Sequence, residues 1–302
     1  MHGRKPCWAV GTVAWVAIAV LGPGSALGAG PVRFADGQPD NDVQPSVLTP
    51  AQEAFMAKKL AMAAAIGTIG SGVGKSMGGA VPTFACEFDP CEDTPTWPPA
   101  GGPPASKVLL TKARQQNNWY YCGPASGQVV INWTRGIING TDDGEATATN
   151  WRKQSKIAVW MGTTIAGTGG ANLAAGLNNP NAVVKPTADW IYAYADIGTM
   201  HELYDKIVTD VAAFGMPLVL ATAPHLSGAG VNFLESWPNV APGAHHWIVI
   251  RGYDGPWGGS SPVIIRYQDS SAGYGGATGA FDDTISVIWQ VSKWNQGGHV
   301  VW

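Results

Sequence analysis

Along the chain, the first predicted element is a helix over residues 48–67, where the largely apolar run LTPAQEAFMAKKLAMAAAIG begins with helix-start signals. Thr49 can cap this helix, Pro50 suits its first helical position, and Gln52 completes a capping box with Thr49. The helix is followed by a glycine-rich stretch, which is typical of a flexible connection.

Two more helices are predicted further along the chain. Residues 122–133, CGPASGQVVINW, form a short helix with Pro124 near its first turn. Residues 201–215, HELYDKIVTDVAAFG, form an amphipathic helix that ends at Gly215. Its apolar side carries Leu203, Tyr204, Ile207, Val208, Val211 and Phe214.

Three strands are predicted from short apolar and β-branched runs. They cover MPLVLATA at 216–223, HWIVIRGYD at 246–254 and PVIIRYQD at 262–269. The last two can form a hairpin across the turn GPWGGSS. Helices followed much later by antiparallel strands indicate an α+β domain.

The N-terminal pattern is different and indicates export. Arg4 and Lys5 precede the apolar run 8–21, and Ala26 and Gly28 suit the −3 and −1 positions of a signal peptidase site. A membrane-spanning helix usually needs about 20 apolar residues, more than this run offers. We therefore expect a signal peptide over residues 1–28 and a secreted, extracellular protein with no later membrane span.

The amino-acid composition limits which classes of binding partner are expected. The net charge is −3, charged residues make up 13% of the chain, and there is no Lys/Arg-rich run. Nucleic acid is therefore not expected as a partner. Glycine (40) and tryptophan (14) are frequent, which fits short strands, many loops and an aromatic-rich surface or core.

A Pro-rich segment separates two parts of the mature chain. Residues 94–106, TPTWPPAGGPPAS, have the composition of a linker. We place a boundary near residue 105, with an N-terminal arm or propeptide over 29–105 and one larger domain over 106–302. Few contacts are expected to cross such a linker, so the arm should be dispensable for folding of the domain.

The cysteines suggest one free thiol. Signal cleavage removes Cys7, and Cys86 and Cys91 are close enough in sequence to form a local disulfide. A metal site at these two residues is less favoured, because no other Cys or His lies near them in sequence. Cys122 is then left unpaired in an oxidising compartment.

A free cysteine is often a buried, inert thiol, but the setting of Cys122 favours reactivity. It stands at the start of a predicted helix, where unpaired N–H groups and the helix dipole favour the thiolate. His245 and His246 begin a predicted strand and Asp269 ends the next one, so a base and an orienting acid are available. Alternation along a strand sends the two histidines to opposite faces, so only one can be the base.

This order of Cys, then His at a strand start, then an acid after the following strand resembles papain-like cysteine peptidases. Gln116 stands six residues before Cys122, as does the glutamine that helps to form their oxyanion hole. Gly252 stands six residues after His246 and is followed by Tyr253, which matches their His, apolar run, Gly-Tyr pattern and selects His246 over His245.

Over roughly residues 108–292 the chain is closer to the bacteriocin-processing (double-glycine leader) peptidase branch and its secreted bacterial relatives. The shared motifs, in order, are Q…YCGPAS, a helix, GMPLVL, then H…GYD and D. The resemblance implies a papain-like α+β fold, with the helix of Cys122 packed against an antiparallel sheet that carries His246 and Asp269. It also implies hydrolysis of a peptide or protein substrate without any metal or cofactor.

Two departures from the family pattern leave the acid open. The segment between His246 and Asp269 is lengthened by GPWGGSSP, and Ser270 stands where the family often has proline. Asp254 is the alternative acid, although an Asp at such a position is more often a turn former.

Three functions remain open at this stage: a cysteine peptidase, an acyl transferase or cell-wall amidase with the same catalytic residues, and a non-catalytic Trp-rich binding protein on a peptidase fold. Trp119 and Trp247 flank the candidate nucleophile and base, so they could line a substrate cleft. Packing in the core and at its rim is the simpler role for both residues.

Overall fold

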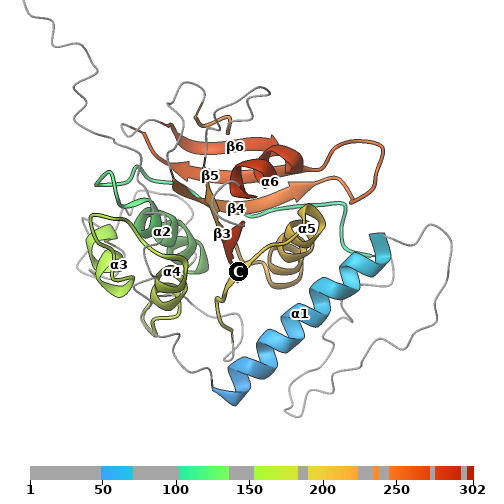
Figure 1. Cartoon of the computed structure of the whole chain (residues 1–302), viewed down its shortest axis with the longest axis horizontal. Helices are drawn as coiled ribbons and strands as arrows, with labels where there is room; N and C mark the ends of the chain where they lie inside the picture. Colours follow the sequence, from blue (N-terminus) through green and yellow to red (C-terminus); the bar gives the residue numbers. More distant parts are fainter. Residues whose placement is uncertain are drawn as a thin grey trace, which may run out of the picture.

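The computed structural model describes residues 49–70, 102–135, 153–182, 190–223, 234–237, 245–272, 276–293 and 298–302. The expected signal peptide and the Cys86–Cys91 disulfide lie outside these ranges. Within them, the helices and one antiparallel sheet form the α+β fold predicted from the sequence (Figure 1). No helix among the described residues is both long enough and apolar enough to cross a bilayer.

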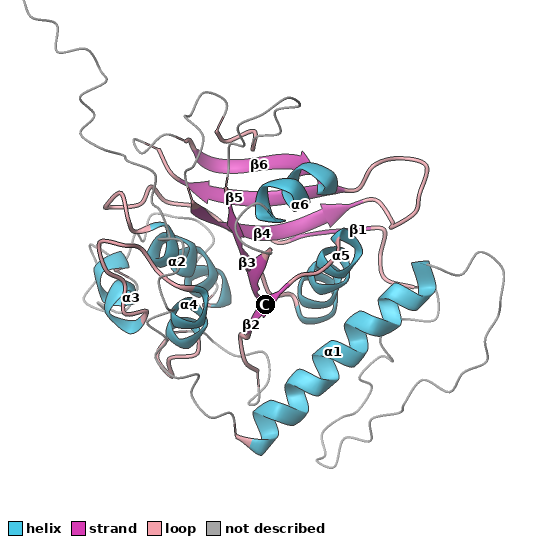
Figure 2. Cartoon of the chain, in the orientation of Figure 1, coloured by secondary structure: helices cyan, strands magenta, loops and turns pink. Residues whose placement is uncertain are grey.

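Helices and strands are distributed along the whole described chain (Figure 2). The helices are α1 (Pro50–Gly70), α2 (Cys122–Thr134), α3 (Gln154–Trp160), α4 (Gly170–Leu177), α5 (Met200–Val208), the π-helix η3 (Thr209–Phe214) and α6 (Ile285–Lys293). The strands are β1 (Ser106–Val108), β2 (Tyr194–Asp196), β3 (Leu218–Thr222), β4 (His246–Asp254), β5 (Ile264–Ser270), β6 (Thr278–Thr284) and β7 (His299–Val301).

The described strands form one sheet in the order β2-β7-β3-β4-β5-β6, and β1 adds to β4. Every pairing is antiparallel. The hairpin expected across the GPWGGSS turn is confirmed, because β4 and β5 pair directly. The three strands predicted from sequence thus lie side by side at the centre of the sheet.

The central strands of the sheet are buried on both faces, and alternation along them supplies both cores. On β3, Leu218 and Leu220 join the core under α5 and α6, whereas Val219 and Ala221 join the core under α2, α3 and α4. Figure 1 shows these two groups of helices on opposite sides of the strands. An all-apolar strand such as β3 is what burial on both faces requires.

The predicted caps and ends of helices are confirmed. Thr49 N donates to Gln52 Oε1 (3.0 Å) and Gln52 N donates to Thr49 Oγ1 (3.3 Å), which is the capping box expected at α1. The helical segment predicted to end at Gly215 does so, with Gly215 in the left-handed region at φ 64°. Its last part, η3, is a π-helix, which the apolar spacing did not predict.

Close packing against β1 explains why glycine stands at position 252, in the motif that selected His246. A Cβ at this position would lie 2.6 Å from the carbonyl oxygen of Lys107, so only glycine lets β1 pair with β4 here. The Tyr253 hydroxyl donates to the Pro104 carbonyl (2.8 Å) and fixes the start of the domain. These contacts begin close to the boundary expected near residue 105.

α1 packs on the domain, contrary to the expectation that few contacts would cross the linker. Its side chains Phe55, Ala63 and Ile66 are buried in the two cores, and α1 contacts α5 and η3. The fully buried Lys59 Nζ lies 2.9 Å from Asp210 Oδ1 of η3. Burial lowers the pKa of Lys59 and raises that of Asp210, and the attraction between the two charges opposes both shifts.

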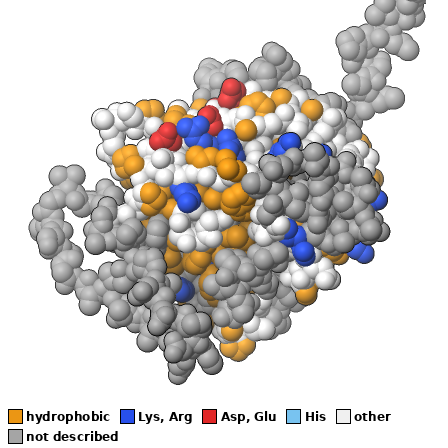
Figure 3. Space-filling view, turned by 180° about the vertical axis from the view of Figure 1, so that it is seen from behind, with side chains coloured by type: hydrophobic (Ala, Val, Ile, Leu, Met, Phe, Trp, Pro, Cys, Tyr) orange, Lys and Arg blue, Asp and Glu red, His pale blue; other side chains and the backbone are white. Residues whose placement is uncertain are grey.

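The surface seen from behind in Figure 3 mixes hydrophobic, polar and charged side chains. Lys and Arg side chains of the described residues are scattered on this face rather than gathered in a stripe.

We predict that Lys59→Met lowers the free energy of unfolding by about 3–5 kcal/mol, because it leaves Asp210 buried without its partner. Lys58→Met in the same helix is the control, and a change within about 0.5 kcal/mol is expected for it. Urea unfolding of both variants measures the difference. Equal stability of the two variants would show that the ion pair does not secure α1, and would restore the view that the arm is dispensable.

Candidate active site

Cys122 is the first residue of α2, and it is buried with 1% of its surface exposed. The first N–H groups of a helix have no partner within the helix, so they point toward this end. The residue after Cys122 must be small, because a Cβ on Gly123 would lie 2.5 Å from Thr168 Oγ1. The Cys-Gly-Pro sequence therefore brings the loop before α4 against the start of α2.

His246 is the first residue of β4 and connects the other two candidate residues. Its Nε2 lies 2.8 Å from Asp269 Oδ1. The Cys122 side chain also acts on His246, because it is one of the groups that raise the pKa of this imidazole. Cys122, His246 and Asp269, predicted together from motif order, are thus brought together in space with His246 in the middle.

The electrostatics of the site favour a charged pair. Burial disfavours the imidazolium of His246, but the charge of Asp269, their hydrogen bond and the Cys122 thiolate raise its pKa to about 10. Burial likewise disfavours the Asp269 carboxylate, yet His246 and the hydrogen bonds from Ser271 and Ser236 hold its pKa below the ordinary value. His246 and Asp269 are therefore both ionised at neutral pH.

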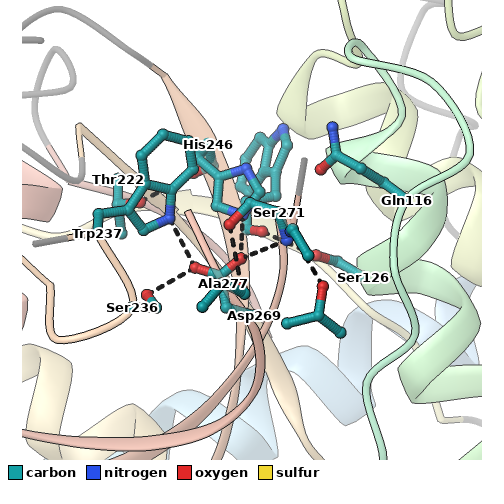
Figure 4. A network of polar contacts seen from close by, with 12 residues as sticks. Gln116, Ser126, Thr222, Ser236, Trp237, His246, Asp269, Ser271 and Ala277 are labelled. Atoms are coloured by element: carbon teal, nitrogen blue, oxygen red, sulfur yellow. Dashed lines mark hydrogen bonds and ion pairs between the residues drawn. The ribbon is translucent and has the colours of Figure 1, made fainter. Parts of the chain in front are cut away.

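Asp269 is held by more donors than the sequence indicated (Figure 4). Its Oδ2 accepts from Ser236 Oγ (2.8 Å) and from Trp237 Nε1 (2.8 Å), and its Oδ1 accepts from Ser271 N (3.0 Å). The Trp237 ring also packs near the His246 ring, with centroids 5.1 Å apart. Sequence reasoning missed Ser236 and Trp237, whose only signal is a Ser-Trp pair in a stretch without regular periodicity.

A close contact holds Trp237 in place. A Cβ on Gly276 would lie 2.6 Å from Trp237 Nε1 and 2.1 Å from Ser271 Oγ. Glycine at position 276 therefore lets the chain after β5 pack directly on the indole that donates to Asp269.

The lengthened β4–β5 connection does not disturb the site. The turn lies at one end of the hairpin, whereas His246 at the start of β4 and Asp269 near the end of β5 lie at the other. Asp254, the alternative acid, is at the turn end, where it is exposed and bonds Arg266 Nη2 (3.2 Å). The acid beside His246 is Asp269.

Gln116 lies beside the site with its main chain fixed to the strand of Asp269, because its N–H donates to the Ser270 carbonyl (2.8 Å). Its side-chain Nε2 donates to the carbonyls of Asn118 (3.0 Å) and Trp119 (3.1 Å). Its Oε1 is buried without a hydrogen-bond partner. The amide is thus held in place, with its N–H groups directed at the turn before α2.

The two candidate cleft tryptophans differ. Trp119 is 39% exposed and packs edge-on against Tyr120, with ring centroids 5.4 Å apart. Trp247 is 2% exposed, and its indole N–H donates to the Thr168 carbonyl (2.9 Å). Trp247 therefore packs in the core, which is the simpler of the two roles expected from the sequence. Of the two tryptophans, only Trp119 offers an accessible ring.

Among the described residues, no group of three or more His, Cys, Asp or Glu side chains could hold a metal ion.

A comparison with protein families matches residues 108–290 to the Peptidase_C39 like family. The chain belongs to this family. No curated protein matches it in sequence.

Solved structures of peptidases are also similar to the chain. The recombinant stem bromelain precursor is 11% identical, with a TM-score of 0.33, and the match covers 66% of this chain and 70% of that one. The digestive procathepsin L2 proteinase from Tenebrio molitor larval midgut is 14% identical, with a TM-score of 0.31 and coverage of 66% and 67%. The bromelain protease from Ananas comosus in complex with the E64 inhibitor is 13% identical, with a TM-score of 0.30 and coverage of 65% and 97%.

We predict that the imidazole of His246 titrates near pH 10 and that Asp269→Asn lowers its pKa toward the ordinary value of about 6.5. Asp254→Asn, at the far end of β4, is the control and should leave the titration unchanged. Because the folded-state pKa of His246 is raised, its pairing with Asp269 stabilises the fold fully below about pH 6.5, and this stabilisation is lost as pH rises toward about 10.

The measurement is an NMR titration of the histidine ring in the wild type and both variants. A larger change in Asp254→Asn than in Asp269→Asn would transfer the role of the acid to Asp254.

Proposed function

We propose that this protein is a secreted cysteine peptidase that hydrolyses peptide bonds through Cys122, His246 and Asp269. The observation that carries the proposal is the position of His246, which bonds Asp269 and interacts with the Cys122 side chain, with all three side chains buried. A thiol, an imidazole and a carboxylate in this order are the parts of an activated nucleophile.

In this mechanism the Cys122 thiolate attacks the substrate carbonyl carbon, and the carbonyl oxygen becomes an oxyanion. The imidazolium of His246 then protonates the leaving amine, and an acyl-enzyme remains. The neutral imidazole removes a proton from water, which attacks the acyl-enzyme and releases the acid and the thiolate. Asp269 fixes the orientation of His246 and stabilises its charged form throughout.

The oxyanion hole of this proposal is formed by the Cys122 backbone N–H and the Gln116 side-chain amide. The Gln116 amide nitrogen has two hydrogens, and both can be engaged by the carbonyls of Asn118 and Trp119. One of them has to turn from these carbonyls to the oxyanion during the reaction. Because the oxyanion oxygen carries more negative charge than the carbonyl oxygen of the bound substrate, this N–H binds it more strongly. Stronger binding in the transition state than in the ground state is the condition for raising the rate.

Secretion after cleavage of a signal peptide over residues 1–28 is part of the same proposal and rests on the sequence pattern alone. The nearer likeness to bacteriocin-processing peptidases also rests on the sequence pattern alone. An acyl transferase or a cell-wall amidase would use the same three residues. Detection of free acid or of a transferred acyl group separates hydrolysis from acyl transfer, and the substrate that is cleaved separates the peptidase from the amidase. A non-catalytic Trp-rich binding protein would need none of them.

We predict that Cys122→Ala and His246→Ala each abolish peptide hydrolysis while the fold persists. Gln116→Ala should be milder, with a loss of about 10²–10³ in rate, because it removes one oxyanion donor. Rates on a peptide library, with circular dichroism as the check on folding, measure these effects. More than a few per cent of wild-type activity in Cys122→Ala or His246→Ala would remove that residue from the mechanism.

We also predict that iodoacetamide alkylates Cys122 at pH 5–6, where an ordinary thiol is almost entirely protonated. The helix N-terminus and the neighbouring imidazolium both favour the thiolate. In His246→Ala the reactive range should move upward by a pH unit or more. A wild-type rate that rises only near pH 8–9, or slow labelling at every pH, would identify Cys122 as an inert buried thiol.

A further inference from the structure

Two hydroxyl groups outside the three catalytic side chains bond to the start of β4, where His246 lies. Ser126 Oγ donates to the carbonyl of Trp247 (3.0 Å), and Thr222 Oγ1 donates to the carbonyl of His246 itself (3.1 Å). Figure 4 shows both residues beside His246. Both side chains are buried, with 2% and 0% of their surface exposed.

Ser126 connects the nucleophile to the base. It follows Cys122 by one turn of α2, so the two side chains lie on the same side of the helix. A serine inside a helix commonly bonds back to the carbonyl of the preceding turn. Ser126 instead bonds to a residue 121 positions away, the immediate neighbour of His246. This bond fixes how far the start of α2 lies from the start of β4.

Thr222 holds the residue next to Trp247 on β4, His246 itself, from the side of β3. It ends β3 and is the register partner of His246. Successive carbonyls of a strand point in opposite directions within the sheet, so the donors to Trp247 and His246 restrain β4 on both of its edges. The base therefore stands on a strand end that is restrained toward α2 and toward β3.

We propose that Ser126 and Thr222 are positioning residues that set the separation between Cys122 and His246. This inference rests on the proposed function, because it concerns the thiolate–imidazolium pair. At an effective dielectric of about 20, an increase in separation of about 1 Å from about 3.5 Å weakens the attraction enough to reduce the equilibrium constant for forming the charged pair about sixfold. Loss of either hydroxyl acts through this distance and not through any contact with substrate.

The chain offers a matched control for the loss of a buried hydroxyl. Ser292 on α6 is fully buried, and its Oγ has no hydrogen-bond partner. Ser292→Ala therefore removes the same group as Ser126→Ala without disturbing β4. Thr222→Val keeps the shape of the side chain and removes only the donor, whereas Thr222→Ser keeps the donor.

The experiment measures the rate of iodoacetamide alkylation of Cys122 from pH 5 to pH 9 in the full-length protein and these variants. In Ser126→Ala and Thr222→Val the rate at pH 6 should fall, by up to about sixfold, because the charged pair is less populated. At pH 9, where an ordinary thiol is largely ionised, the rate should stay near that of the wild type. Ser292→Ala and Thr222→Ser should follow the wild type at every pH.

Wild-type profiles in both Ser126→Ala and Thr222→Val would overturn the inference and leave the proposed function intact. An equal reduction at pH 6 and pH 9 would also overturn it, because it would indicate a change of access or of stability. If Ser126→Ala does not fold, the comparison of Thr222→Val with Thr222→Ser decides. A wild-type protein without reactivity in acid would instead refute the proposed function itself.

Discussion

A carboxylate can be buried only if donors replace the water it loses, and the candidate site is built around this requirement at Asp269. Its two oxygens accept from His246, Ser236, Trp237 and the Ser271 N–H. These donors come from β4, from the segment before it and from the end of β5. Satisfying one anion thus brings three parts of the chain together and orients the imidazole between the carboxylate and the thiol.

Local signals in the sequence predicted much of the secondary structure around the site. The capping box at Thr49, the helix end at Gly215 and the apolar run of β4 each depend on neighbours within a few residues, and each is present in the structure. The order and spacing of the motifs then predicted which Cys, His and Asp meet. The lengthened β4–β5 connection and Ser270 in place of proline left the acid open in the sequence. In the structure, a turn at one end of the hairpin leaves the other end, with Asp269, unchanged.

Contacts between distant segments could not be predicted in this way. The donors Ser236 and Trp237 belong to no periodic pattern, so nothing in their own sequence indicates that they reach Asp269. The burial of Trp247 depends on the loop at Thr168, and the π-helical turn accompanies the pairing of Asp210 with Lys59. In each case the decisive partner is far along the chain, where composition and periodicity give no information.

The pairing of Lys59 with Asp210 joins residues 151 positions apart. The entropy of closing a loop grows only with the logarithm of its length, and each doubling adds about 0.6 kcal/mol. The connection between α1 and the domain can therefore become longer or shorter during evolution with little effect on stability. An insertion or deletion within α1 would instead rotate Lys59 away from Asp210. Among homologous chains, variation in length should collect between α1 and β1, and the spacing of buried residues within α1 should stay constant.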